Sequence, residues 1–115
     1  MVVDDEPMIR RLVTWILERR GYSVIVAIDG QDGLDHFERH EDIDLVLSDI
    51  VMPRLDGVSM VEQLRLRRPD IPVLFMSGYT GPERSALKDE DLHRLLDKPF
   101  TAEQLVERIE QILTR

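Results

Sequence analysis

The sequence predicts an α/β domain in which a parallel five-stranded sheet carries helices on both faces. Short apolar runs of strand length alternate five times with segments of helical periodicity. This alternation is typical of a parallel sheet with right-handed crossovers. The length of 115 residues is that of one domain, which buries roughly two thirds of its unfolded surface. We therefore expect a single domain over residues 1–115.

The strands are expected in five short apolar runs, and four of these stand out clearly. They comprise residues 1–3, 43–47, 72–76 and 94–96, and residues 22–27 form the fifth. Each run has the length of a strand and is too short for an independent helix. The segments between the runs are therefore expected to be helical.

Four of these helices have clear sequence signals. Pro7 suits a first helical turn and Gly21 a helix stop; the apolar stripe between them is Ile9, Leu12, Val13, Ile16 and Leu17. The second helix is expected over residues 33–40, and the third over residues 58–68, up to the boundary set by Pro69. In the last helix, Thr101 and Gln104 form a capping box ahead of the stripe Leu105, Val106, Ile109, Ile112 and Leu113.

The remaining helical segment, residues 82–92, has few apolar anchors. Only Ala86, Leu87 and Leu92 are apolar among residues that are mostly charged. Because so little apolar surface is available for burial, we expect this segment to be mobile.

Composition excludes several classes of function. The net charge of −8 would repel phosphate backbones, so direct binding of nucleic acid is not expected. The chain has no cysteine, which excludes disulfides and thiolate chemistry. No apolar run approaches the roughly 20 residues that span a bilayer, and no basic-then-apolar leader opens the chain. We expect a cytoplasmic domain without a membrane partner.

Polar side chains follow the apolar runs closely. They are Asp4, Asp5 and Glu6 after the first run, Asp49 after the third, Ser77 after the fourth and Lys98 after the fifth. In a parallel sheet these positions share one edge, and ligands bind there at the point where the strand order reverses. A flavodoxin-like order 2-1-3-4-5 places that point between the first and third strands. Asp4, Asp5 and Asp49 are then expected to face one another.

Such a cluster of carboxylates requires a cation. Adjacent strands lie about 4.8 Å apart, and two carboxylates at 4 Å repel by about 4 kcal/mol at an effective dielectric near 20. All-oxygen ligands at a site open to solvent favour Mg²⁺, which retains several waters and also binds phosphate oxygens. The sequence therefore predicts a magnesium site at this edge of the sheet.

Two further side chains suit phosphoryl chemistry at the same edge. Lys98 is long enough to reach Asp49 from two strands away, and Ser77 needs only a short reach from the neighbouring strand. A metal ion, an ammonium and a hydroxyl around one carboxylate could stabilise the three equatorial oxygens of a phosphoryl group. Asp49 would then be the nucleophile and form an aspartyl phosphate.

With these residues in place, the sequence resembles the receiver domain of bacterial two-component response regulators over essentially its whole length. The matching motifs are Asp4-Asp5-Glu6-Pro7, Asp49 followed by Met52-Pro53 and Asp56-Gly57, Ser77-Gly78, and Lys98-Pro99-Phe100. Their order and spacing together are far more specific than any one of them. Residues 75–80 look most like receivers attached to hybrid sensor histidine kinases.

The resemblance implies the metal and phosphoryl chemistry in detail. Asp49 is implied to accept a phosphoryl group from the histidine of a kinase or of a histidine phosphotransfer protein. Asp5, Asp49 and the carbonyl of Val51 are implied to ligate Mg²⁺, with Asp4 acting through a water molecule. Catalysis is then confined to the domain's own phosphoryl group, its acceptance and slow hydrolysis, and the domain is not otherwise an enzyme.

The resemblance also implies contacts and switching away from the metal. Ser77 and Lys98 are implied to contact the phosphoryl oxygens, and the Lys98–Pro99 peptide to be cis. Switching is expected at the fourth helix, fifth strand and fifth helix, with a downstream effector protein as the further partner. A weak homodimer through the last two helices is an alternative to a monomer.

The sequence departs from the family pattern at three places, one of which is the unusually polar segment 82–92 described above. Leu95 stands where the family carries its switch aromatic, and Tyr79, close to Ser77, is a candidate substitute. Only three residues precede Asp4, fewer than a first strand usually has. The sequence is therefore interpreted either as a stand-alone protein with a shortened first strand or as a fragment of a longer protein.

Two other functions compete with the phosphoacceptor hypothesis. A phosphotransferase of the haloacid dehalogenase type needs a second Asp where the chain has Val51. A phosphorylation-independent interaction domain would not need the full set of acids, Ser77 and Lys98.

His36 and His40, four residues apart, are interpreted as surface residues. Met8 and Trp15 lie about 100° off the core stripe of the first helix. They are interpreted either as flank packing or as a partner-docking edge.

Overall fold

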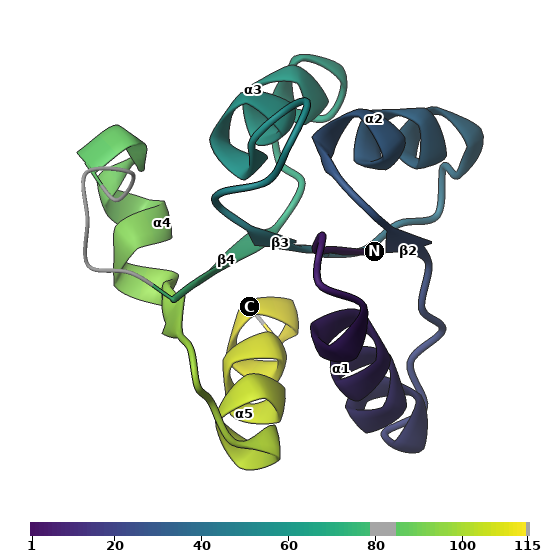
Figure 1. Ribbon diagram of the computed structural model, residues 1–115, viewed down its shortest axis with the longest axis vertical. Coiled ribbons are helices and arrows are strands. Elements are labelled where there is room, and N and C mark those ends of the chain that lie inside the picture. The colour runs from purple at the N-terminus through teal and green to yellow at the C-terminus, as the bar shows by residue number, and fades with distance from the viewer. Residues whose placement is uncertain (79–84, 115) are drawn as a thin grey trace.

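The computed structural model describes residues 1–78 and 85–114, and these form a parallel sheet of five strands with helices on both faces (Figure 1). The strands are β1 (Val2–Val3), β2 (Val26–Ala27), β3 (Val46–Asp49), β4 (Val73–Ser77) and β5 (Leu96–Asp97). The helices are α1 (Pro7–Arg19), α2 (Gly30–Arg39), α3 (Gly57–Arg67), α4 (Asp89–Arg94) and α5 (Ala102–Leu113). The predicted α/β class and flavodoxin-like architecture are confirmed.

The sheet has the order β2-β1-β3-β4-β5, with every pair of neighbouring strands parallel. Helices α1 and α5 cover one face, α2 and α3 cover the other, and α4 lies beside β4 at the edge (Figure 1). Each face has its own buried cluster. One contains Phe37, Met60 and Leu64 from α2 and α3, and the other contains Val13 and Leu105 from α1 and α5. The strand order reverses between β1 and β3, as the sequence predicts.

Several strands begin later than the apolar runs predict. The run from residue 43 was expected to be strand, but β3 begins at Val46, and the run from residue 22 reaches the ladder only at Val26. The leading residues are apolar because they pack into the two clusters, as Ile43 and Val24 do, and they lie outside the paired ladder. Strands β3 and β4 also end later than the apolar runs, so Asp49 and Ser77 are their last residues.

Helix boundaries agree closely where a cap is present. The Thr101–Gln104 capping box at the start of α5 is confirmed. Helix α2 begins three residues earlier than expected, because Asp29 caps it by accepting the amide of Asp32 at 2.9 Å. On α1, Leu12 was expected in the core stripe, but it is 46% exposed.

The anchoring of α4 agrees with the prediction only at Leu87. Ala86 and Leu92, expected as apolar anchors, are exposed, whereas Leu87 and Leu95 on either side of the helix are buried. The buried residue within α4 is charged: Asp91 accepts two hydrogen bonds from the Arg65 guanidinium, each 2.9 Å long. The expected mobility of residues 82–92 falls partly on positions outside the described residues.

No helix in the described part of the chain has the length and apolar character needed to cross a bilayer.

Candidate functional site

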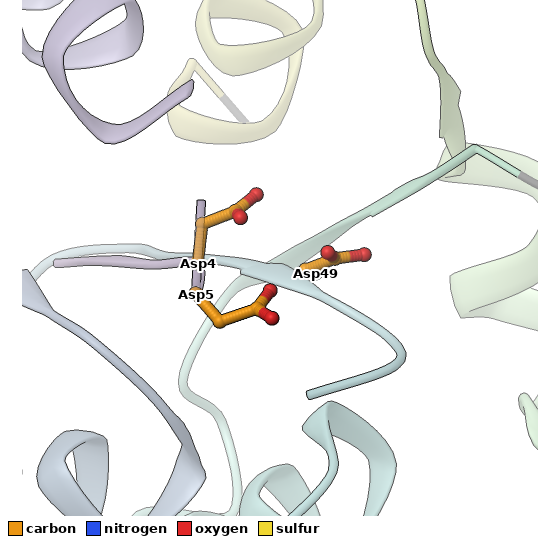
Figure 2. Close-up of side chains that lie close together, drawn as sticks. All are labelled: Asp4, Asp5 and Asp49. Carbon is orange, nitrogen blue, oxygen red and sulfur yellow. The ribbon is translucent and has the colours of Figure 1, made fainter. Parts of the chain in front are cut away.

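Three carboxylates gather at the carboxyl ends of β1 and β3 (Figure 2). Val3 of β1 is in register with Ser48 of β3, so Asp4 and Asp49 come next on adjacent strands. One oxygen from each of Asp4, Asp5 and Asp49 lies within 4.8 Å of the others. Asp4 and Asp49 are buried, and Asp5 is exposed. The convergence predicted from the strand order is therefore present.

Lys98 directly follows β5, the strand at one edge of the sheet, and its side chain extends to this cluster. Its Nζ donates to Asp4 Oδ2 at 3.1 Å and to Asp49 Oδ2 at 3.2 Å. Glu6 Oε1 lies 3.8 Å from the same ammonium. The side chain of Lys98 is 13% exposed, so its ion pairs with the buried Asp4 and Asp49 are largely shielded from water, whereas Glu6 is mostly exposed. The long reach expected of Lys98 is observed.

The backbone fixes the second oxygen of each buried carboxylate. Asp4 Oδ1 accepts the amide of Glu6 at 2.9 Å, and Asp49 Oδ1 accepts the amide of Ile50 at 2.8 Å. The Asp4 carbonyl also accepts a hydrogen bond from the Arg10 guanidinium at 2.7 Å. Both carboxyl groups are thereby oriented, with their Oδ2 atoms toward Lys98.

Burial and charge shift the two central ionisable groups. Burial raises the pKa of the Asp49 carboxyl; the Lys98 ammonium opposes this shift, and the neighbouring Asp4 adds to it. Burial alone would lower the pKa of the Lys98 ammonium, but attraction to Asp49 and Asp4 outweighs burial and raises it. Lys98 is therefore a permanent cation at neutral pH, and Asp49 is a carboxylate destabilised by its surroundings.

Ser77 ends β4 beside Lys98. It is 3% exposed, and its carbonyl accepts the amide of Lys98 at 2.8 Å, which joins β4 to β5 at the site. The Lys98–Pro99 peptide is cis, as the resemblance implies. Tyr79, the candidate switch residue, lies outside the described residues. Leu95 is 7% exposed and packs in the core.

The loop after β3 approaches the site closely. Val51 lies in this loop, two residues beyond Asp49, and is 54% exposed. At the end of the loop, a Cβ placed on Gly57 would lie only 2.0 Å from the Asp49 carbonyl oxygen. Only glycine can bring the start of α3 this near to Asp49, which explains the Asp56-Gly57 motif.

The donor set fits a hard divalent cation. All three acidic side chains offer oxygen, the ligand that Mg²⁺ prefers, and exposed Asp5 leaves the site accessible to hydrated ions. The three negative charges of Asp4, Asp5 and Asp49 exceed the single positive charge of Lys98, so the cluster retains an excess of negative charge. A bound cation would relieve their mutual repulsion.

Among the ion pairs of the described residues that sequence reasoning missed, two involve buried aspartates. Asp29 pairs with Arg54 from the loop after β3, and Asp91 pairs with Arg65 of α3. The signal at Asp29 was available, because Asp before a helical pattern is a common N-cap. The pairing of Asp91 with Arg65, 26 residues earlier, had no local signal.

Among the residues that the structure describes, the two histidines of α2 do not belong to a second cluster of three metal ligands. His36 and His40, interpreted from the sequence as surface residues, are instead partly buried. Their ring centroids lie 6.0 Å apart, and Asp32 lies 3.6 Å from His36 Nε2. In the described part of the chain, only Asp4, Asp5 and Asp49 bring three potential metal ligands together.

The fold and this site together define a parallel α/β domain with an acidic, lysine-containing site at the switch point of its sheet. Comparison with known proteins identifies the family to which this fold and site belong. The family model described as "Response regulator receiver domain" matches residues 1–110. The chain belongs to this family, the receiver domains of two-component response regulators.

Individual relatives include both regulators and a sensor kinase. The chain is 34% identical to the alkaline phosphatase synthesis transcriptional regulatory protein PhoP of Bacillus subtilis, covering 100% of the chain and 48% of that protein. It is 33% identical to the sensor kinase CckA of Brucella abortus, covering 100% of the chain and 12% of CckA. The chain thus spans about half the length of the first curated relatives it matches.

Among solved structures, a response regulator receiver domain protein from Clostridium thermocellum is similar, with a TM-score of 0.88 and 28% identity. The similarity covers 99% of this chain and 92% of that structure. The fold similarity therefore extends over nearly the whole chain.

Proposed function

We propose that the chain is one receiver domain over residues 1–115 that accepts a phosphoryl group on Asp49 from a histidine kinase or a histidine phosphotransfer protein. One observation carries this proposal: Lys98 Nζ contacts both buried carboxylates, Asp4 at 3.1 Å and Asp49 at 3.2 Å, beside the exposed Asp5. An ordinary surface lysine or a solvated helix terminus would not produce this arrangement.

Each residue has a role in the proposed reaction. Asp49 Oδ1 is held by the Ile50 amide, and Oδ2 accepts a hydrogen bond from Lys98. Oδ2 would attack phosphorus while the bond to the donor nitrogen breaks and its electron pair stays on that nitrogen. Lys98 then compensates the charge on the transferred oxygens, and Ser77 donates to one of them.

Asp5, Asp49 and the Val51 carbonyl would hold Mg²⁺, with Asp4 acting through water. When bound, the ion neutralises the developing phosphoryl charge. Catalysis would be confined to the domain's own phosphoryl group. We place the domain in the cytoplasm, with an effector protein downstream and switching at α4, β5 and α5.

The proposal is tested by intact mass after incubation with acetyl phosphate and Mg²⁺. We expect a gain of one phosphoryl group, and loss of that gain when a chelator removes the metal, because the clustered acids repel an incoming phosphate in its absence. A gain that persists in excess chelator would exclude the metal requirement. No gain in folded protein, with acetyl phosphate or with any kinase tested, would favour a phosphorylation-independent interaction domain.

A stripe on α1 is the surface that we propose for kinase docking. Met8 is 80% exposed, Leu12 46% and Trp15 59%. They lie four and three residues apart, on one side of the helix. Exposure of all three excludes flank packing for Met8 and Trp15, the first of the two interpretations drawn from the sequence.

Replacing Met8 and Trp15 by serine should weaken docking and leave the acid site intact. For a histidine kinase that phosphorylates the wild-type domain, we expect the transfer rate at subsaturating kinase to fall by roughly tenfold or more, with acetyl phosphate labelling unchanged. Leu66→Ser is the matched control, since Leu66 is 84% exposed on α3. Equal transfer rates in the variant and the control would rule out this stripe.

A further inference from the structure

The loop that joins β3 to α3, residues 50–56, is fastened to the start of α2 by an ion pair. Arg54 Nε lies 2.8 Å from Asp29 Oδ2, and Arg54 Nη2 donates to Asp29 Oδ1 at 3.1 Å. The side chain of Asp29 is only 7% exposed, and its Oδ1 also accepts the amide of Asp32 as the N-cap of α2. The loop is therefore tied to a carboxylate that the helix itself holds in place.

Backbone contacts bring the same two segments together. The Gly30 amide donates to the Leu55 carbonyl at 3.2 Å, and a Cβ on Gly30 would lie 2.2 Å from that carbonyl oxygen. Glycine at position 30 thus allows the loop to lie directly on the first turn of α2.

Arg54 adopts a conformation that most residues avoid. Its φ is 67°, and among the described residues it is the one non-glycine residue with a positive φ. A residue with a Cβ is disfavoured in this left-handed region, so surrounding contacts must stabilise it. The bonds to Asp29 are contacts of this kind, which indicates that the ion pair helps to determine the path of the loop.

The other part of the loop is fixed to Asp49. The Ile50 amide donates to Asp49 Oδ1, and the Gly57 amide donates to the Ile50 carbonyl, both at 2.8 Å. Val51 lies between these bonds and Arg54. Because its side chain is 54% exposed, packing of Val51 itself does little to determine where its carbonyl lies. The position of that carbonyl depends on the anchors on either side, which include the buried side chains of Ile50 and Met52 as well as these bonds.

We propose that the Arg54–Asp29 ion pair is a positioning device for the metal site, holding the loop so that the Val51 carbonyl completes the ligand set of Asp5 and Asp49. The inference rests on the proposed function, which gives Val51 its role. Neither Arg54 nor Asp29 belongs to the acidic cluster, so both act through the loop. Their loss should weaken the metal site and leave its three carboxylates in place.

The test is calorimetric titration with Mg²⁺ of Arg54→Gly and Asp29→Asn. Glycine tolerates the positive φ and asparagine remains a good N-cap, so both variants remove the ion pair with little other damage. We expect the Mg²⁺ dissociation constant to rise by about tenfold in each, as for other residues that orient metal ligands. At saturating Mg²⁺, labelling by acetyl phosphate should return close to the wild-type rate, which a general loss of structure would not allow.

Arg67→Ala is the matched control. Arg67 pairs with Glu38 and also bridges α2 and α3, but neither residue belongs to the loop. Arg67 is 57% exposed, much like Arg54 at 60%, whereas its partner Glu38 is 50% exposed and Asp29 only 7%. The Mg²⁺ affinity of Arg67→Ala should equal that of the wild type. The double variant Asp29→Asn/Arg54→Gly should show the shift of one single variant, because both changes break the same contact.

The outcomes separate this inference from the proposed function. Wild-type affinity in both single variants, or shifts that add in the double variant, would overturn the positioning role while leaving the phosphoacceptor intact. If the wild-type protein binds no Mg²⁺ and gains no phosphoryl group, the proposed function fails first, and the inference fails with it.

Discussion

Replacing Asp49 by asparagine is expected to abolish phosphorylation and at the same time to stabilise the folded domain in the absence of metal. Phosphorylation is lost because an amide oxygen is too weak a nucleophile to form the acyl phosphate. Stability rises because the amide side chain would carry no charge beside Asp4, at a position where burial already penalises the carboxylate. The readouts are intact mass after acetyl phosphate and Mg²⁺, and thermal unfolding followed by circular dichroism.

The direction of the stability change follows from the raised pKa of Asp49. A carboxyl with a pKa above 3.8 in the folded state begins to destabilise the fold as the pH rises past 3.8, and the full cost is present above the folded pKa. Each kcal/mol recovered in Asp49→Asn should raise Tm by roughly 4–8 °C at pH 7. At pH values well below 3.8, the difference between the two proteins should vanish.

Asp5→Asn is the matched comparison, because Asp5 is the exposed member of the cluster. Its Tm should rise less than that of Asp49→Asn. A lower Tm for Asp49→Asn than for the wild type would mean that attraction to Lys98 outweighs burial and repulsion, contrary to the argument above.

The second large effect is expected at the Arg65–Asp91 ion pair. Arg65→Met would leave a carboxylate that is 4% exposed without its partner, which typically costs about 3–5 kcal/mol. Detachment of α4 would limit this cost, because Asp91 is the buried residue of that helix. We therefore expect a loss of up to about 3 kcal/mol in urea unfolding, together with faster amide exchange over residues 89–94.

A double variant distinguishes charge burial from packing. Adding Asp91→Leu to Arg65→Met removes the unpaired charge, so most of the lost stability should return. Glu90→Gln is the control on the same helix: the Glu90–Arg94 pair spans 3.1 Å, but Glu90 is 69% exposed, so its loss should cost less than about 0.5 kcal/mol. A single Arg65→Met variant as stable as this control would contradict the assigned role of the pair.

The fold could be predicted from the sequence because its main signals are local. Apolar runs alternating with helical patterns identify the α/β class, and caps such as Thr101 identify helix starts. Strand starts were less accurate, since an apolar run shows burial and not ladder pairing, as Ile43 illustrates. Leu12 shows the corresponding error on a helix, where periodicity alone did not reveal which edge of the stripe lacks a neighbour.

The convergence of Asp4, Asp5, Asp49 and Lys98 was predictable because each follows a strand and the topology aligns strand ends. The contacts of Arg54 and Arg65 were not, because each bridges segments 25 or 26 residues apart. Such pairs depend on how helices and loops pack over the sheet, and no short-range pattern encodes that packing.

The placement of Trp15 determines what an optical experiment on this domain can detect. It is the single tryptophan, it lies on α1 with 59% of its surface exposed, and the Arg19 guanidinium stacks 4.8 Å from its ring centroid. Its emission therefore reports events on the solvent side of α1, such as a protein binding there, and says little about the carboxylates. We therefore expect the fluorescence of Trp15 to change when a protein binds to α1 and to change little when a ligand binds to the acid cluster.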